Sequence, residues 1–235
     1  MSALLRSTLA RLSVIVPVLN EESAIQRTLD SLQAWRDDGA EIIVVDGGSR
    51  DQTLTLARPL ADRVLVAGPG RAQQMNRGAC AARAPTLLFL HADSILPTMG
   101  LRSILTVLDQ GARWGWHDIR LSGPHWPFRM IERMMNLRSR LTRVATGDQA
   151  IFVEAALFRH CGGFPDIELM EDIALSQRLR GHARPVCMPG PCLTSSRRWE
   201  RHGIWRTVLL MWQLRLRFFF GAQPRDLARM YREAR

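Results

Sequence analysis

The amino-acid sequence predicts an α/β fold, with a mostly parallel, doubly wound sheet, flanking helices and a C-terminal helical appendage. Strand-like and helix-like segments alternate through the first 110 residues, as they do when parallel strands are joined by crossover helices. Residues 42–45 are consecutive β-branched residues, which indicates a strand buried on both faces. That strand stops at Asp46 and is followed by Gly47 and Gly48. Such strand ends are where open α/β sheets bind ligands.

The first half of the chain contains four apolar runs with the length and composition of buried strands. They lie at residues 13–18, 42–45, 63–67 and 86–90. Pro17 must lie near the end of the first strand, because proline has no N–H to donate to a central ladder. Helices are expected at residues 20–36, 51–57 and 72–83, and from Pro97 to about residue 110. We therefore expect Asp46 and residues 91–93 to lie at one edge of the sheet.

After residue 110 the alternation weakens. Expected elements are an edge strand at 114–122, a basic amphipathic helix at 127–143, a turn at 162–165, a helix from 169 to about 181, and short strands at 185–188 and 192–195. No internal repeat or low-complexity linker is visible. We therefore expect residues 1–200 to form one domain and residues 201–235 to form basic amphipathic helices.

The charge of the chain is concentrated near its C-terminus. The net charge is +10, and every basic residue is Arg. Residues 197–235 contain ten Arg against Glu200, Asp226 and Glu233, a net charge of +7. Such a segment favours nucleic acid, an anionic membrane or phosphorylated substrates as partners. Nucleic acid is disfavoured, because the chain has one Tyr and no stacking motif, and because nucleic-acid binding would not explain the carboxylates discussed below.

The four cysteines form no Cys-x-x-Cys pair and lie at no zinc-ligand spacing, so they are expected to be reduced thiols in a cytosolic protein. The first twelve residues contain Arg6 and Arg11 and no long apolar core, so they make a poor signal peptide. We expect a cytoplasmic protein. Its basic C-terminal segment is also compatible with peripheral association with the inner face of the membrane.

Two acidic positions are candidates for chemistry. Asp93 follows His91 and Ala92 directly after a buried strand, where a carboxylate can hold a hard divalent cation; the alternative is a helix cap ahead of Pro97. Glu171 and Asp172 open a helix, where the helix dipole alone would favour two carboxylates, and a carboxylate there can also act as a general base.

Two basic segments are candidates for binding phosphate. Arg71 and Asn76 follow a Gly-Pro-Gly turn and could contact phosphate or a base. This turn lacks the third glycine of a dinucleotide fingerprint, which excludes NAD by this motif. Arg198 and the preceding Arg197 offer two guanidinium groups for a diphosphate, and Trp199 offers an aromatic face for a sugar. The alternative for the second segment is a solvated basic turn.

Taken together, five segments resemble the family 2 glycosyltransferases of the GT-A fold. They are Val-Ile-Val-Pro-Val-Leu-Asn-Glu-Glu, Ile-Ile-Val-Val-Asp-Gly-Gly-Ser-Arg-Asp, Gly-Arg-Ala-Gln-Gln-Met-Asn-Arg-Gly-Ala, Leu-Phe-Leu-His-Ala-Asp and Met-Glu-Asp. Each motif is weak alone, and five in this order are strong. The resemblance runs from about Ser13 to Trp199. It is closest to the small bacterial rSAM/selenodomain-associated transferase 2 subgroup, which shares Gly-Asp-Gln, Leu-Met-Glu-Asp and Ser-Ser-Arg-Arg-Trp-Glu.

The resemblance implies a nucleotide-sugar donor and a set of residues that bind it. The implied donor-binding residues are Pro17, Asn20, Glu22, Asp46, Arg71, Asn76, Arg198 and Trp199. The first three would line the nucleotide pocket. Asp46 would bind the base or ribose, and Arg71 and Asn76 would close over the nucleotide.

The resemblance also implies a divalent metal, Mn²⁺ or Mg²⁺, and a base. Asp93 stands at the last position of the family's Asp-x-Asp metal motif, and Asp172 of the pair Glu171 and Asp172 would deprotonate the acceptor hydroxyl. A single displacement by the acceptor would invert the anomeric centre. His91 replaces the first Asp of the metal motif, and imidazole is a poor ligand for Mg²⁺. Ser195 replaces the Gln of the Gln-x-x-Arg-Trp motif, which argues against a processive polysaccharide synthase.

The segment from Thr207 to Phe220 has two interpretations. It contains Arg215 and Arg217 and is too short and too charged to span a bilayer. It suits either an amphipathic helix at a membrane surface or a helix packed on the core. The first interpretation fits a lipid-linked or otherwise membrane-borne acceptor, and the acceptor itself is not identified by the sequence.

Two other functional classes compete with this interpretation. A nucleotidyltransferase uses a related sheet but needs a glycine-rich loop after the first strand, where this chain has Pro-Val-Leu-Asn-Glu-Glu. A non-catalytic nucleotide-sugar-binding protein is compatible with His91. The presence of both Asp93 and Asp172 argues against it.

Overall fold

The sheet of the computed structural model has eight strands in the order β3-β2-β1-β4-β7-β6-β8-β5. The strands are β1 Leu12–Val18, β2 Glu41–Asp46, β3 Arg63–Val66, β4 Thr86–Phe89, β5 Ser94–Ile95, β6 Trp114–Leu121, β7 Phe152–Glu154 and β8 Val186–Thr194. The structure describes residues 10–233, without the side chain of Arg198. The N-terminal segment considered as a signal peptide lies mostly outside this range.

The four N-terminal strands form the parallel unit that the sequence predicts. β1 pairs in parallel with β2 on one side and β4 on the other, and β2 pairs in parallel with β3. Val18 lies opposite Asp46, so β1 and β2 end together. Pro17 lies one residue before the end of β1, as expected. β7 joins this unit antiparallel to β4 and extends the sheet toward β6, β8 and β5.

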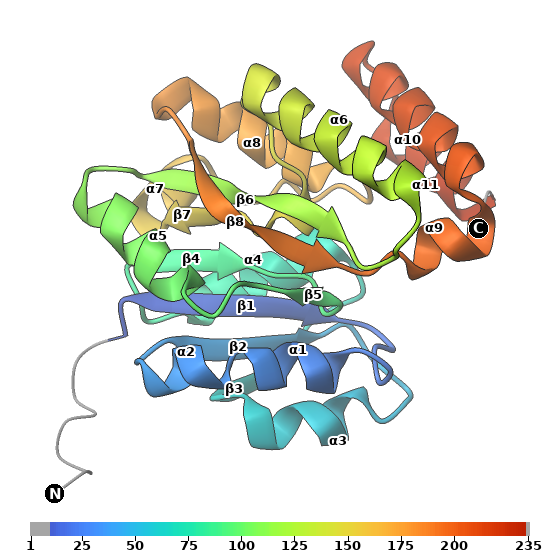
Figure 1. Ribbon diagram of the computed structural model, residues 1–235. Helices are drawn as coiled ribbons and strands as arrows, with labels where there is room; N and C mark the ends of the chain where they lie inside the picture. The colour runs from blue at the N-terminus through green and yellow to red at the C-terminus, as the bar shows by residue number, and fades with distance from the viewer. Residues whose placement is uncertain (1–9, 234–235) are drawn as a thin grey trace, which may run out of the picture.

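Helices cover both faces of the sheet (Figure 1). They are α1 Ile25–Ser31, α2 Gln33–Asp37, α3 Thr53–Ala57, α4 Arg71–Ala81, α5 Gly100–Asp109, α6 Trp126–Thr142, α7 Ala155–His160, α8 Glu171–His182, α9 Arg197–His202, α10 Ile204–Phe219 and α11 Pro224–Glu233, with short 3₁₀ turns η1 Arg58–Leu60 and η2 Gly147–Gln149. The alternation of β1 divides the core: Val14 and Val16 pack with α1, α2 and α5, while Ile15 packs with α4, α7 and α8.

The helix expected at residues 20–36 is wrong in its start and its continuity. It begins at Ile25, and it is broken at Leu32 between α1 and α2. The side-chain amide of Gln33 donates to the carbonyl of Leu29 at 2.8 Å and to that of Leu60 at 3.0 Å. In a continuous helix the carbonyl of Leu29 would accept from the backbone N–H of Gln33. Here it accepts from the side-chain amide of Gln33, which permits the break at Leu32.

Two strand predictions in the second half are also wrong. The strand at Trp114–Leu121 is not at an edge, because it pairs antiparallel with β7 and in parallel with β8. The two short strands expected at 185–188 and 192–195 are one strand, β8. Its Pro189 and Pro191 fall at a register shift between His117 and Ile119 of β6, where missing backbone donors are tolerated.

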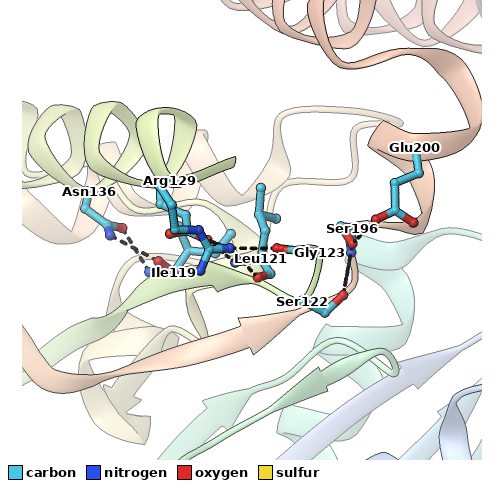
Figure 2. Close-up of polar contacts among 9 residues, drawn as sticks. Ile119, Leu121, Ser122, Gly123, Arg129, Asn136, Ser196 and Glu200 are labelled. Carbon is cyan, nitrogen blue, oxygen red and sulfur yellow. Dashed lines mark hydrogen bonds and ion pairs between the residues drawn. The ribbon is translucent and has the colours of Figure 1, made fainter. Parts of the chain in front are cut away.

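Helix α6 is fixed to β6 by side chains that bond to strand backbone (Figure 2). Asn136 accepts from the N–H of Ile119 at 2.9 Å and donates to its carbonyl at 3.1 Å. Arg129 donates to the carbonyl of Leu121 at 2.8 Å. These bonds pair backbone groups of β6 near the shift in its register with β8. They also set the position of α6.

The C-terminal helices pack on the core through one side of α10, and their contact with a membrane surface stays a prediction. Leu214 of α10 and Leu227 of α11 are buried with Val144, Met170 and Ile173 at the start of α8. The other side of α10 exposes large apolar side chains, which are Trp205, Leu209, Trp212, Leu216 and Phe219. No helix within residues 10–233 is long and apolar enough to cross a membrane.

Candidate active site

The polar residues that follow β2 and β4 lie at one edge of the sheet, on either side of the end of β1. Asp46 is 2% exposed, and its carboxylate accepts from the backbone N–H groups of Gly48 and Ser49, each at 3.0 Å. These bonds hold the turn after β2. His91 and Asp93 follow β4 directly. The structure therefore brings together the two strand ends that the sequence indicates.

The loop between β1 and α1 is tied to the loop between β2 and α3. Asn20 adopts a φ of 54°, in the left-handed region that Asn tolerates better than most residues, and its Oδ1 accepts from the N–H of Arg50 at 2.9 Å. The carboxylate of Glu22 accepts from the N–H of Gln52 at 3.0 Å. Pro17 lies buried beside this loop. The contact of these three predicted residues with a nucleotide stays a prediction.

Glu21, which is not among the predicted site residues, lies where several charges converge. Burial raises the pKa of its carboxyl and the negative charge of Asp93 adds to this, while Arg197 and Arg71 lower it. Arg197 also donates to the hydroxyl of Ser23 at 2.8 Å, which ties the start of α9 to the loop after β1. Two carboxylates and two guanidinium groups from four distant segments thus face the same edge.

The metal candidate His91 and the base candidate Asp172 meet at Gly147. The N–H of Gly147 donates to Oδ2 of Asp172 at 2.6 Å. A β-carbon at Gly147 would lie 2.5 Å from Nε2 of His91 and 3.5 Å from Oδ2 of Asp172. The other oxygen of Asp172 accepts from the N–H of Ile173 at 2.7 Å. The carboxylate is therefore held in a fixed orientation beside the end of β4.

Glu171 is buried next to Asp172 and faces Arg71. Its Oε1 lies 3.8 Å from Nη1 of Arg71, and its side chain is 5% exposed. Burial, together with the charge of Asp172, raises the pKa of Glu171 to about 7, and Arg71 opposes both effects. Since Asp172 is the more exposed of the two, it is the better placed to meet a substrate.

Two predicted donor-binding residues, Asn76 and Trp199, make contacts within the protein. The amide of Asn76 is occupied by the backbone of Phe164, donating to its carbonyl at 2.8 Å and accepting from its N–H at 3.0 Å. Trp199 packs against the apolar cluster between β6 and α6. The side chain of Arg198 lies outside the described residues. Asn76 and Trp199 thus have structural contacts, and the donor contacts of all three stay predictions.

Sequence reasoning missed several residues of this edge. Glu21 could have been found, since it stands beside Glu22 in the same motif. Gly147 belongs to the Gly-Asp-Gln stretch, which was recognised without a role. Gln74 carries no local signal, although its buried amide donates to the carbonyl of Val18 at 2.7 Å and joins the ends of β1 and β2. Arg197 was expected to bind a diphosphate together with Arg198, but its bond to Ser23 in the loop after β1 was not predicted.

The side chains near Asp93 would supply only part of the ligands that a divalent cation needs. Among residues 10–233, no group of three or more His, Cys, Asp and Glu side chains could hold a metal ion. The oxygen of Asp93 and the imidazole of His91 are a mixed set that suits Mn²⁺ better than Mg²⁺. The mutual repulsion of Glu21 and Asp93 shows that added positive charge would be favourable here. A cation at this edge would need its other ligands from a diphosphate and water.

Solved structures with this arrangement are glycosyltransferases of the GT-A fold. TarS of S. aureus (residues 1–349) superposes with a TM-score of 0.65 and 21% identity over 84% of this chain and 64% of that chain. The mannosyltransferase PcManGT of Pyrobaculum calidifontis gives a TM-score of 0.65 and 20% identity over 97% of this chain and 70% of that chain. The fold of this chain is therefore that of the GT-A proteins.

The sequence places the chain within a family of that class. Residues 13–159 match the model of glycosyl transferase family 2, which is more than half of the chain, and the chain belongs to this family. An uncharacterized glycosyltransferase of Mycobacterium tuberculosis is 32% identical over 118 residues, covering 49% of this chain. A PGL/p-HBAD biosynthesis glycosyltransferase of the same organism is 36% identical over 91 residues, covering 36% of each chain. The chain spans about half the length of the first of these relatives.

Proposed function

We propose that this protein is an inverting glycosyltransferase that moves a sugar from a nucleoside-diphosphate donor to an acceptor hydroxyl. The observation that supports this most is the convergence of Asp93, Arg71, Arg197 and Asp172 at the carboxyl ends of the parallel strands. Such a site offers positive charge for a leaving diphosphate and a carboxylate for an attacking hydroxyl.

The donor is a nucleotide sugar, bound at the edge formed by β1, β2 and β4. TarS has been solved in complex with UDP-GlcNAc, and the Pyrobaculum mannosyltransferase in complex with GDP-Man and Mn²⁺. By analogy, Pro17, Asn20, Glu22 and Asp46 line the nucleotide pocket. Asp93 and His91 hold a divalent cation, which would stabilise the negative charge of the departing diphosphate.

Asp172 is the general base that takes the proton from the acceptor hydroxyl. The bond from the N–H of Gly147 fixes one carboxylate oxygen and so orients the group. Glu171, buried and paired with Arg71, holds that arginine near the donor. One direct displacement inverts the anomeric centre, and no enzyme nucleophile is needed.

The finer assignments belong to the same proposal. Residues 1–200 form the transferase domain and residues 201–235 its helical appendage, and the chain belongs with the small bacterial rSAM/selenodomain-associated subgroup. The protein acts in the cytoplasm and contacts the inner face of the membrane through the segment from Thr207 to Phe220. A lipid-linked acceptor is consistent with the exposed apolar side of α10.

Calorimetric titration of UDP, GDP and dTDP, with Mn²⁺, with Mg²⁺ and with EDTA, tests the donor site; NAD serves as the negative control. We expect one nucleoside diphosphate to bind selectively and to require the metal. Asp93→Asn should abolish this metal-dependent binding with the fold intact. Unchanged Mn²⁺-dependent binding in that variant would remove Asp93 from the metal site.

Asp172→Asn separates binding from chemistry. The variant should bind the nucleoside diphosphate as the wild type does and lose transfer by about 10²–10⁴-fold, the usual contribution of a general base. Full transfer activity would exclude Asp172 as the base. If the wild-type protein binds no nucleotide at all, the transferase proposal fails and a non-catalytic role is favoured.

A further inference from the structure

Two arginines from the helices that cover the end of the sheet lie near Asp148, in the loop that holds Asp172. Arg138 comes from α6, and Arg215 comes from α10. Neither was assigned to the donor site, and neither belongs to a motif of the family resemblance. The negative charge of Asp172 acts on Arg138, so the base candidate lies near this guanidinium.

Arg138 is held against η2 by a chain of hydrogen bonds. Its Nη2 donates to the hydroxyl of Ser139 at 2.9 Å, and this hydroxyl donates to Oε1 of Gln149 at 2.7 Å. The same oxygen accepts from the N–H of Thr146 at 3.0 Å. Gly147, the next residue, donates to Asp172. The guanidinium of Arg138 is thus positioned by the loop that positions the base.

Arg215 reaches the same place because of how α10 packs. The preceding residue, Leu214, is fully buried against Val144, Met170 and Ile173 at the entrance to α8. The charge of Arg215 acts on both Arg138 and Asp148, so its guanidinium lies near both. α6 and α10 are in contact through the cluster of Ile131 and Val208, and they lie side by side in Figure 1.

The two guanidinium groups lie near Asp148 without pairing closely with it. Neither forms an ion pair with any carboxylate in the described part of the chain, and Nε of Arg138 is buried without a hydrogen-bond partner there. Burial and the neighbouring charge of Arg215 lower the pKa of Arg138 to about 10. The negative charges of Asp148 and Asp172 oppose this effect, and burial raises the pKa of the Asp148 carboxyl. Two neighbouring like charges, of which Arg138 is desolvated and has a spare donor, are an arrangement that a bound anion would stabilise.

We propose that Arg138 and Arg215 bind a phosphate group of the acceptor and so bring its hydroxyl to Asp172. Two guanidinium groups match the oxygen atoms of a phosphate, and Arg binds phosphate in a bidentate manner. Arg138 lies near the base candidate Asp172, whereas Arg71 and Arg197 act on Glu21 at the proposed donor site. This inference rests on the proposed transferase function and narrows its acceptor to a phosphorylated molecule.

The test uses the full chain with its donor site filled. The protein is saturated with Mn²⁺ and the nucleoside diphosphate that binds, and inorganic phosphate is then titrated by calorimetry. We expect phosphate to bind, and Arg138→Gln and Arg215→Gln each to weaken it at least ~10-fold, a loss of one bidentate charge-assisted contact. Arg138→Lys, which keeps the charge but not the fork, should give an intermediate loss.

Two exposed arginines on the same helices provide matched controls. Arg133→Gln on α6 and Arg206→Gln on α10 should leave phosphate affinity unchanged. Nucleoside diphosphate affinity should be unchanged in all four Gln variants. Phosphate affinity that is equal in the wild type and the Arg138 and Arg215 variants would overturn the inference, and so would the absence of phosphate binding in a wild type that still binds nucleotide.

Competition experiments identify the molecule that carries the phosphate, and nucleotide binding tests the proposed transferase function separately. Competition by glycerol 3-phosphate supports a soluble acceptor, and competition only by phosphatidylcholine vesicles that contain phosphatidic acid supports a lipid acceptor. If the wild type binds no nucleoside diphosphate, the transferase function fails. Phosphate binding that still depends on Arg138 and Arg215 would then support the anion site alone.

Discussion

At the scale of single residues, Gly147 permits the closest approach in the site. Its lack of a β-carbon lets His91 lie over the backbone that holds Asp172. The residue is not in the left-handed region, so its requirement is spatial and not conformational. Any side chain at this position must displace His91 or the loop that orients Asp172, and both movements change the site.

Gly147→Ala should therefore lower the free energy of unfolding by about 1–3 kcal/mol, as overpacking does, and weaken Mn²⁺-dependent nucleotide binding. Urea unfolding and calorimetry measure the two effects. Gly181→Ala is the control, because a β-carbon there meets nothing within 4 Å and the residue lies in α8. It should leave nucleotide binding unchanged. Equal behaviour of the two variants would contradict the spatial explanation.

Glu171 gives stability a dependence on pH. The pKa of its carboxyl is raised from the ordinary value of 4.5 to about 7 in the folded protein, so the folded state binds the proton more tightly. The stabilisation of the folded state that comes from this tighter proton binding is fully present below pH 4.5. It is lost as the pH rises through about 7. The shift corresponds to roughly 3 kcal/mol. Glu171→Gln should make the free energy of unfolding less dependent on pH between pH 4.5 and 7 in urea titrations. An unchanged slope would show that this carboxyl is not perturbed.

At the scale of elements, α6 depends on side chains that replace a strand partner. Asn136 satisfies both backbone groups of Ile119, as Figure 2 shows. Asn136→Ala leaves these buried groups unpaired and should lower the free energy of unfolding by about 1–3 kcal/mol. Arg133→Ala, on the exposed side of the same helix, should change it by less than about 0.5 kcal/mol. If Asn136→Ala also changes the free energy of unfolding by less than about 0.5 kcal/mol, water replaces the amide in these two hydrogen bonds.

The sequence predicts the parallel half of the fold well because its signals are local. Buried runs such as residues 42–45 are read from consecutive side chains, and β1 to β4 lie within one residue of their expected ends. The central position of β6 was missed, because it depends on β8, about seventy residues later. The break at Leu32 likewise depends on a side-chain bond to Leu60.

The residues of the candidate site show the same difference between local signals and contacts distant in sequence. Asp93 and Asp172 stand next to recognisable strand and helix boundaries, so their importance was visible in the sequence. Arg138 was noted only within an amphipathic helix, since its relation to Asp172 arises from the path of α6 across β6. Trp199 was expected at the donor because of its neighbours in the motif. That contact stays a prediction, and the side chain of Trp199 packs against an apolar cluster.

At the scale of the whole molecule, charge and apolar surface coincide at the C-terminal helices. The basic segment at residues 197–235 includes α10, whose exposed side carries Trp212 at 62% and Phe219 at 77% exposure. The protein should sediment with phosphatidylglycerol vesicles at low salt and be released as salt increases. Trp212→Gln combined with Phe219→Gln should weaken sedimentation several-fold. Sedimentation equal to that of the wild type would assign the exposed side another role.

The pairing of β5 with β8 has a consequence for synthesis. Ser94 follows the metal candidate Asp93 and pairs with Thr194, one hundred residues later. During translation, β1 to β4 can assemble soon after they leave the ribosome, since their contacts are close in sequence. The strand beside Asp93 must wait until nearly the whole chain has been made. The nascent protein would thus acquire strands β1 to β4 early and its donor site last, which limits nucleotide capture by incomplete chains.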